Sequence, residues 1–185
     1  PPSLLAVPPS LPAQSVKDLI ALAKAKPGQL NYSTASSDTR LAGELFKAMA
    51  RINIVIVPYS SGTVGLSDLL AGQVQLTFGN ILVVTPHLKS GKLKVLAVTT
   101  ATPSSIFPDI PTVAASVPGF EKASIGAMFA PGRTPEAIIR RLNQELVRVL
   151  NLPDVKTMYL SGGIEAAPGS PQELAVNMKS SRAKW

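Results

Sequence analysis

The chain contains no cysteine and a single histidine, His87. Without cysteine it can form no disulfide, no thiolate nucleophile and no cysteine-ligated metal site, although this absence does not fix a cellular compartment. One histidine cannot build a histidine-based metal site, and the chain has no Gly-x-Ser-x-Gly sequence typical of a hydrolytic serine. The acidic residues are spread along the chain rather than paired. We therefore expect no catalytic residues, no metal site, no cofactor and no enzymatic activity.

Aromatic residues make up only 5% of the chain and charged residues only 16%, against 45% hydrophobic residues. Alanine, valine, leucine and isoleucine must therefore fill the core, as in layered α/β proteins. The net charge of +7 favours an anionic partner, but the basic residues are dispersed and do not alternate with aromatic residues. We predict a small anion as the partner, and no nucleic acid. Because the apolar stretches are far shorter than the ~20 residues of a membrane span, we predict a chain that is not embedded in a membrane.

Short β-branched segments alternate with amphipathic segments through the first part of the chain. This rhythm predicts strands joined by helical crossovers in a parallel sheet. Ser15 with Asp18 resembles the capped start of a first helix, and Pro27-Gly28 ends that helix. The predicted strands are 29–33, 54–57, 74–78 and 93–98, and the later helical segments are 39–50, 63–71 and a turn at 85–90.

The same pattern divides the chain into three parts. Residues 1–9, an extended segment running into prolines, are predicted to connect two lobes. Residues 10–122 form an α/β lobe, and residues 123–185 form a mostly helical part that needs strands from elsewhere to complete a second sheet. That last part is predicted to contain a strand at 123–130, a helix from Pro135, a helix at 154–160, a brief strand near Ile164 and a final helix opened by the capping box Ser170 to Glu173.

Two loops share one design, in which a strand ends, small polar residues follow and a helix begins. They are Ser33–Thr39 and Tyr59–Thr63, and Asn80 follows the next predicted strand. The first amides of a helix have no intrahelical acceptor and carry the positive end of its dipole, so such loops can bind a carboxylate. In an open α/β sheet they line the ligand crevice. The candidate ligand-binding residues are Ser33, Thr34, Ala35, Ser36, Ser37, Thr39, Tyr59, Ser60, Gly62 and Asn80.

A plainer interpretation fits the same residues. Serine and threonine are preferred N-cap residues in any helix, and Asn80 can equally form a local Asx turn. Asp38 supports this interpretation, because a carboxylate beside the loop repels an anionic ligand unless it points away or caps the helix. Spacing alone leaves both interpretations open.

Several segments, in order along the chain, resemble one protein family. They include Lys26-Pro27-Gly28-Gln29-Leu30-Asn31-Tyr32, Asp68-Leu69-Leu70-Ala71-Gly72-Gln73-Val74 and Phe107-Pro108-Asp109-Ile110-Pro111-Thr112-Val113. On these residues the chain resembles the substrate-binding receptors of tripartite tricarboxylate transporters, the TctC or Bug family. The resemblance implies an α/β fold of the periplasmic binding protein-like type II, with two lobes. Residues 10–122 would then be the second lobe and residues 123–185 the C-terminal part of a first lobe that is incomplete in this chain.

The resemblance also implies a function. It indicates an extracytoplasmic, periplasmic receptor that captures a small carboxylate between two lobes and delivers it to the membrane permease subunits of the transporter. In such receptors the loop matching Ser33–Thr39 helps to hold a ligand carboxylate, and Tyr59 to Gly62 and Asn80 match neighbouring cleft positions. The family commonly has Asp where this chain has Gly79, and this departure favours a carboxylate without an ammonium group.

Two further expectations complete the interpretation. Family members carry a longer N-terminal part, so we expect this chain to be a fragment. The alternative function is a ligand-sensing effector domain of a regulator with the same fold, although no pair of helices suited to DNA binding is visible in the sequence. An enzyme is disfavoured because the acid, base and metal groupings are missing.

Overall fold

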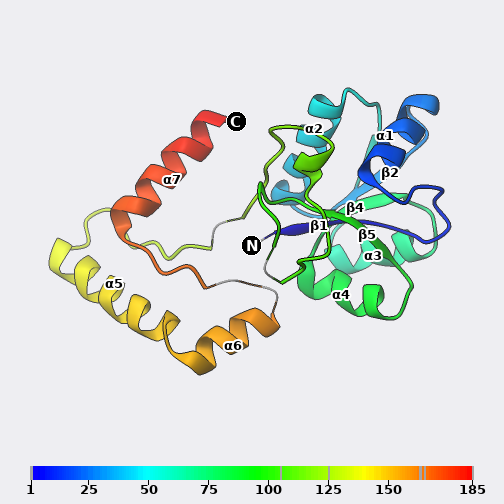
Figure 1. Ribbon diagram of the computed structural model, residues 1–185. Coiled ribbons are helices and arrows are strands. Elements are labelled where there is room, and N and C mark those ends of the chain that lie inside the picture. The colour runs from blue at the N-terminus through cyan, green and yellow to red at the C-terminus, as the bar shows by residue number, and fades with distance from the viewer. Residues whose placement is uncertain (1, 105, 125, 163, 165, 185) are drawn as a thin grey trace. The chain divides into compact units, whose positions relative to one another are not determined.

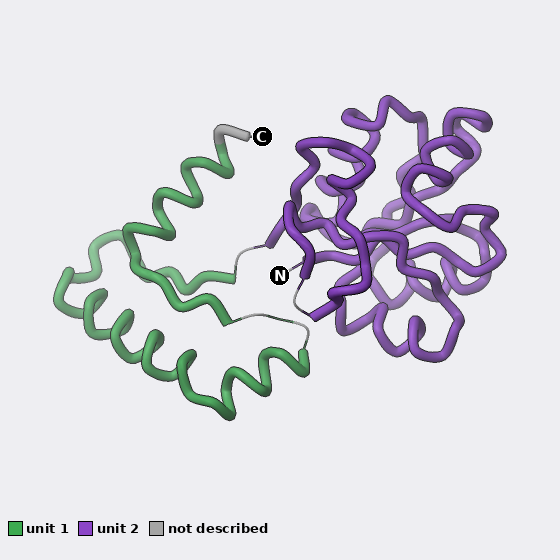
Figure 2. The backbone as a smooth tube through the Cα atoms, viewed as in Figure 1, with its two compact units in different colours: residues 1, 125–185 green, residues 2–124 purple. Residues whose placement is uncertain are grey.

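The computed structural model describes residues 2–104, 106–124, 126–162, 164 and 166–184. The chain divides into two units, residues 2–124 and the residues from 125 onward, which we call the α/β unit and the helical unit (Figure 1, Figure 2). The elements of the α/β unit are β1 (Ser3–Val7), α1 (Val16–Ala25), β2 (Asn31–Thr34), α2 (Ser37–Ala50), β3 (Val55–Pro58), α3 (Gly62–Leu70), β4 (Leu76–Asn80), α4 (Ile81–Lys89), β5 (Lys94–Val98) and a short 3-10 helix (Val113–Ala115).

The strands form one sheet in the order β3-β2-β4-β1-β5. β2 pairs in parallel with β3 and β4, as the alternation of strands and helices predicts, whereas β1 pairs antiparallel with both β4 and β5. The segment 1–9, expected only to connect lobes, thus also contributes an interior strand to the sheet, between β4 and β5. It can do so because the ladder residues Ser3–Val7 include no proline, and the prolines of this segment stand before Ser3 and after Val7.

Helices cover both faces of the sheet, with α1 and α2 on one face and α3 and α4 on the other (Figure 1). Successive β1 side chains enter opposite cores, as the period of a strand requires. Leu5 and Val7 join the apolar cluster with α1 and α2, and Leu4 and Ala6 join the cluster with α3 and α4. All four are fully buried. β1 therefore belongs to both cores at once.

Tyr32 in β2 links the sheet closely to α2. Its ring is fully buried and meets Phe78 edge to face, with 5.8 Å between the ring centroids. The ring also lies against Gly43 of α2, where an added Cβ would be only 2.1 Å from Tyr32 Cε1. Glycine is unfavourable inside a helix, so its presence here is explained by this approach. The contact holds α2 against the strand that leads into it.

The helical unit contains α5 (Glu136–Leu150), α6 (Pro153–Ser161) and α7 (Pro171–Lys184). All three helices were predicted, and the predicted capping box of the last one is confirmed. The amide of Glu173 donates to Ser170 Oγ at 3.1 Å, and the amide of Ser170 donates to Glu173 Oε2 at 2.7 Å. These hydrogen bonds to the carboxylate lower the pKa of Glu173.

The strands predicted for this part of the chain do not form. Ala123 makes only an isolated bridge with Pro2, and neither 126–130 nor Ile164 lies in a strand. Ile125, within the predicted strand, falls outside the described residues. A strand needs a hydrogen-bonded neighbour, and no described residue pairs with 126–130. The apolar face of α5 is only partly covered: Ile139 and Leu146 are half-buried, and the helix has no fully buried residue.

We expect Gly43→Ala to lower the free energy of unfolding by about 1–3 kcal/mol, because the new methyl group overlaps the buried ring of Tyr32. Urea unfolding measures this loss. Gly62→Ala is the matched control, since a Cβ at Gly62 meets nothing within 4 Å and the helix start accepts alanine. Equal stability of the Gly43→Ala variant and the parent would show that α2 does not depend on this approach.

Candidate functional site

Three parallel strands end at the same edge of the sheet, and each runs at once into a helix. β2 leads into α2, β3 into α3 and β4 into α4 (Figure 1). The N-caps are Ser36, Ser61 and Asn80, whose side chains accept hydrogen bonds from the first turn of their own helices. The remaining amides of each first turn have no intrahelical acceptor, and the positive ends of three helix dipoles come to this one edge.

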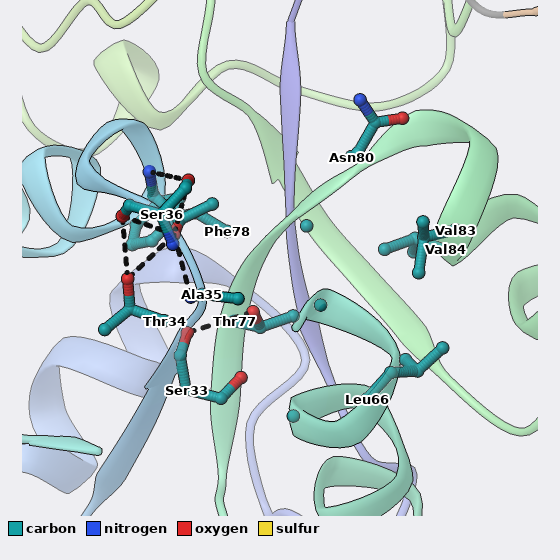
Figure 3. A pocket seen from close by; sticks show the side chains of 14 residues that line it. Ser33, Thr34, Ala35, Ser36, Leu66, Thr77, Phe78, Asn80, Val83 and Val84 are labelled. Atoms are coloured by element: carbon teal, nitrogen blue, oxygen red, sulfur yellow. Dashed lines mark hydrogen bonds between the residues drawn. The ribbon is translucent and has the colours of Figure 1, made fainter. Parts of the chain in front are cut away.

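A cavity of about 220 Å³ lies between these helix starts (Figure 3). It brings together most of the candidate residues, which come from two loops and the end of β4. The candidates that line it are Ser33, Thr34, Ala35, Ser36, Thr39, Gly62 and Asn80. Their role as ligand contacts stays a prediction, but the geometry has gathered them around one space.

Ser37, Tyr59 and Ser60 were also candidates and do not line the cavity. Ser37 is the first residue of α2, and both serines are exposed. The Tyr59 hydroxyl donates to Asp68 Oδ2 in α3 at 2.7 Å, and desolvation together with this carboxylate raises the pKa of Tyr59. Membership of a loop does not determine which way a side chain points, so these three share the loops without sharing the cavity.

The cavity also has lining residues that the sequence analysis missed, namely Gly65, Leu66, Thr77, Phe78, Gly79, Val83 and Val84. They belong to β4 and to the N-terminal halves of α3 and α4, outside the polar loops that the sequence pattern marks. Leu66, Val83 and Val84 face the cavity from the side opposite the hydroxyl groups of Thr34 and Ser36 (Figure 3). Their helical spacing predicts that these apolar residues lie in the core, and it cannot distinguish a core residue from one that lines a cavity.

Val84 takes the space that a side chain at Gly79 would need. A Cβ added at Gly79 would lie 2.4 Å from Val84 Cγ2, and Val84 is fully buried. Thr77, two residues earlier on β4, donates its hydroxyl to the carbonyl of Ser33 at 3.2 Å and ties β4 to β2 at the base of the cavity. The cavity therefore has an apolar wall where β4 meets α4.

The Thr39 hydroxyl is the centre of the hydrogen bonds that shape the loop before α2. Thr39 Oγ1 lies 2.7 Å from Thr34 Oγ1 and 3.2 Å from Ser36 Oγ. The amides of Ala35 and Ser36 both donate to it, each at 3.2 Å. Ser36 and Thr39 also form the capping box of α2, so the plainer interpretation holds for Ser36 as a cap. A loop held this way needs little reordering to receive a ligand.

Tyr32 supports the same loop from the core. Its hydroxyl donates to the carbonyl oxygen of Thr39, so β2 and the first turn of α2 are joined by a side chain as well as by the chain itself. Burial raises the pKa of Tyr32 well above its ordinary value, because the phenolate cannot be solvated there.

Asp38 is turned toward the segment 122–124 instead of the cavity. Its carboxylate accepts hydrogen bonds from the ammonium of Lys122 and, at 3.0 Å, from Ser124 Oγ, and it does not line the cavity. The Lys122 side chain is 4% exposed, whereas that of Asp38 is 51% exposed. The objection that Asp38 would repel an anionic ligand is therefore answered by a cation beside it.

Among the described residues, no charged side chain lines the cavity. Its polar groups are hydroxyls, one side-chain amide and helix ends, which suit an anion that is bound and released. Among the residues that the structure describes, no group of three or more acidic or histidine side chains could hold a metal ion. No helix in the described ranges is both long enough and apolar enough to cross a membrane.

Solved structures define the class of this fold. An R. palustris protein solved with adipate is 37% identical, with a TM-score of 0.90 over 100% of this chain and 62% of its own. MatC from Rhodopseudomonas palustris, solved with bound malate, is 27% identical, with a TM-score of 0.83 over 100% of this chain and 65% of its own. The periplasmic binding protein BugD is 26% identical, with a TM-score of 0.82 over 100% of this chain and 63% of its own. The fold is that of the periplasmic solute-binding proteins.

The family is equally plain. The model of the tripartite tricarboxylate transporter family receptor, TctC, matches residues 1–185, and the chain belongs to this family. The resemblance seen in the motifs is confirmed, and the family and the structural neighbours are binding proteins rather than enzymes. The chain spans 56% and 51% of the length of the first two curated relatives that it matches.

We expect the free energy of unfolding to fall as the pH rises above 10, the ordinary pKa of tyrosine. Folding raises the pKa of Tyr32, so the neutral side chain stabilises the folded state fully below the pKa that Tyr32 has in the unfolded chain. This stabilisation is lost as the pH rises toward the pKa that Tyr32 has in the folded protein. Urea unfolding at a series of alkaline pH values measures this slope. Tyr32→Phe should be less stable near neutral pH and should decline less steeply above pH 10. Parallel curves for the two proteins would contradict the prediction.

Proposed function

We propose that this protein is an extracytoplasmic solute receptor that captures a small carboxylate between two lobes and passes it to a tripartite tricarboxylate-type membrane permease. The observation that carries this proposal is the meeting of three helix N-termini at one cavity, which no charged side chain lines in the part of the chain that the structure describes. Membership of the receptor family supports it from a second direction.

The polar side of the cavity suits a carboxylate. Helix N-termini present open amides and a positive dipole end, each worth roughly 0.3–1 kcal/mol for a nearby negative charge. Ser36 and Thr39 add hydroxyl groups at the rim of α2, and Asn80 brings an amide nitrogen from the start of α4. A ligand held by neutral donors is released more easily than one held in a buried salt bridge. This suits a receptor that must pass its ligand on.

The apolar side suits the carbon skeleton of the same ligand. Leu66, Val83 and Val84 offer hydrocarbon surface opposite the hydroxyl groups, and Gly79 contributes no side chain between them. Two of the similar solved structures contain adipate and malate, both of which carry carboxylates at the ends of a short carbon chain. We infer a ligand of this kind, with one carboxylate at the loop before α2 and its carbon chain along α3 and α4.

The remaining parts of the proposal rest on the family. A two-lobed clamp, a periplasmic location and delivery to permease subunits are what the receptor family supports. The α/β unit would supply the lobe that holds this cavity, and the helical unit would belong to the other lobe.

In the full-length protein we expect adipate or malate to bind with heat detectable by titration calorimetry. Ser36→Ala should then weaken binding roughly tenfold, because a hydrogen bond to a charged group is lost. Ser61→Ala is the matched control, since Ser61 caps α3 as Ser36 caps α2 but does not line the cavity. Both variants should lose about 1 kcal/mol of stability through the lost cap, and only Ser36→Ala should lose affinity.

A loss of affinity shared equally by both variants would reduce Ser36 to a helix cap. Binding of sugars or amines, with no response to any carboxylate, would overturn the proposed ligand class.

A further inference from the structure

Lys122 is buried next to the loop that lines the cavity, and its ammonium donates hydrogen bonds to two side chains of the protein. It donates to Asp38 Oδ2 and, at 2.7 Å, to Ser124 Oγ. Ser124 in turn donates to both oxygens of Asp38, at 3.3 Å to Oδ1 and 3.0 Å to Oδ2. The backbone amide of Lys122 is fixed as well, by a 2.8 Å hydrogen bond to the carbonyl of Thr99. The cation is thus built into the α/β unit and does not contact the cavity.

The stability of α2 does not explain this lysine. Ser36 and Thr39 already cap the helix, and a half-exposed aspartate in the first turn is favourable through the helix dipole without any partner. Burying a lysine, by contrast, removes its ammonium from water, which is costly even when the ammonium is paired. An apolar side chain at this position would pack with no such cost. The free-energy cost comes from burying the positive charge, and that charge forms an ion pair with Asp38.

Asp38 is close enough to the cavity for its charge to matter. It is two residues beyond Ser36 and one before Thr39, and both of those residues line the cavity. Two residues of chain span at most about 7.6 Å between Cα atoms, which is within the Debye length of ~8 Å at physiological salt. An unpaired carboxylate at Asp38 would oppose an incoming carboxylate and offset much of the attraction from the α2 dipole.

We propose that Lys122, supported by Ser124, is a positioning residue for ligand binding that neutralises Asp38 and turns it away from the cavity. This inference rests on the proposed function, since it concerns the charge of the ligand. Lys122 acts through Asp38 and touches no ligand atom. The loop thereby keeps an acidic first turn, which favours the helix, while an anion in the cavity meets the positive end of the α2 dipole.

The test compares adipate affinity, by titration calorimetry, in the full-length parent and three variants. Lys122→Met should weaken adipate roughly three- to tenfold at low salt, because Asp38 is left uncompensated, and the loss should shrink at high salt. The double variant Lys122→Met/Asp38→Asn should recover the parent affinity, because it removes both charges. Lys94→Met is the control for net charge, since Lys94 donates to the carbonyls of Leu11 and Ala13 and does not line the cavity.

A merely structural Lys122 would give a different result. If its role were only to hold the loop in place, the double variant would bind as weakly as Lys122→Met, at every salt concentration, and the inference would be wrong. Parent affinity in Lys122→Met would overturn it equally. A parent protein that bound neither adipate nor any other carboxylate would overturn the proposed function, and this inference with it, so the two failures are distinguishable.

Discussion

Parallel strands put their carboxyl ends at one edge of a sheet, and a helix that follows without a long loop leaves its first amides at that edge. In this protein the constraint acts three times over, at the starts of α2, α3 and α4. The amides that cannot be paired inside the helices must find partners elsewhere, in cap side chains, water or a ligand. The polar lining of the cavity follows from these unpaired amides, because they lie at the edge where the three helices begin.

The cap interpretation and the ligand interpretation of the loops are not exclusive. Ser36 Oγ caps α2 by accepting a hydrogen bond from the amide of Thr39, and Ser36 also lines the cavity. Thr39 gathers the amides of Ala35 and Ser36 onto one hydroxyl, which keeps the loop in a fixed shape. The residues that finish the helix are the residues that shape the site. This economy explains why the sequence pattern alone could not separate the two roles.

Much of the α/β unit could be predicted because its strands and helices differ in period and are bounded by proline and glycine. The orientation of β1 could not, since a short apolar strand has the same pattern in either direction and its partners are far along the chain. The prediction of a strand over 123–130 was wrong at 126–130, because an apolar segment forms a strand only where a neighbouring strand exists to pair with it. Within the site, loop position identified Ser33 and Thr39, but side-chain direction separated Tyr59 from them and brought in Val84.

The antiparallel strand β1 has a consequence for how the unit assembles. Ser3 pairs with Asn80, and Leu4 pairs with Val98, so the two edges that receive β1 are made long after β1 itself leaves the ribosome. β2, β3 and β4 can begin to associate through their crossover helices while that first strand is still unpaired. Contacts so distant in sequence close slowly, since the intervening chain must first be ordered. The pairings of β1 with β4 and β5 thus span the longest sequence separations among the strand pairs, and β5 is joined to the rest of the sheet through β1.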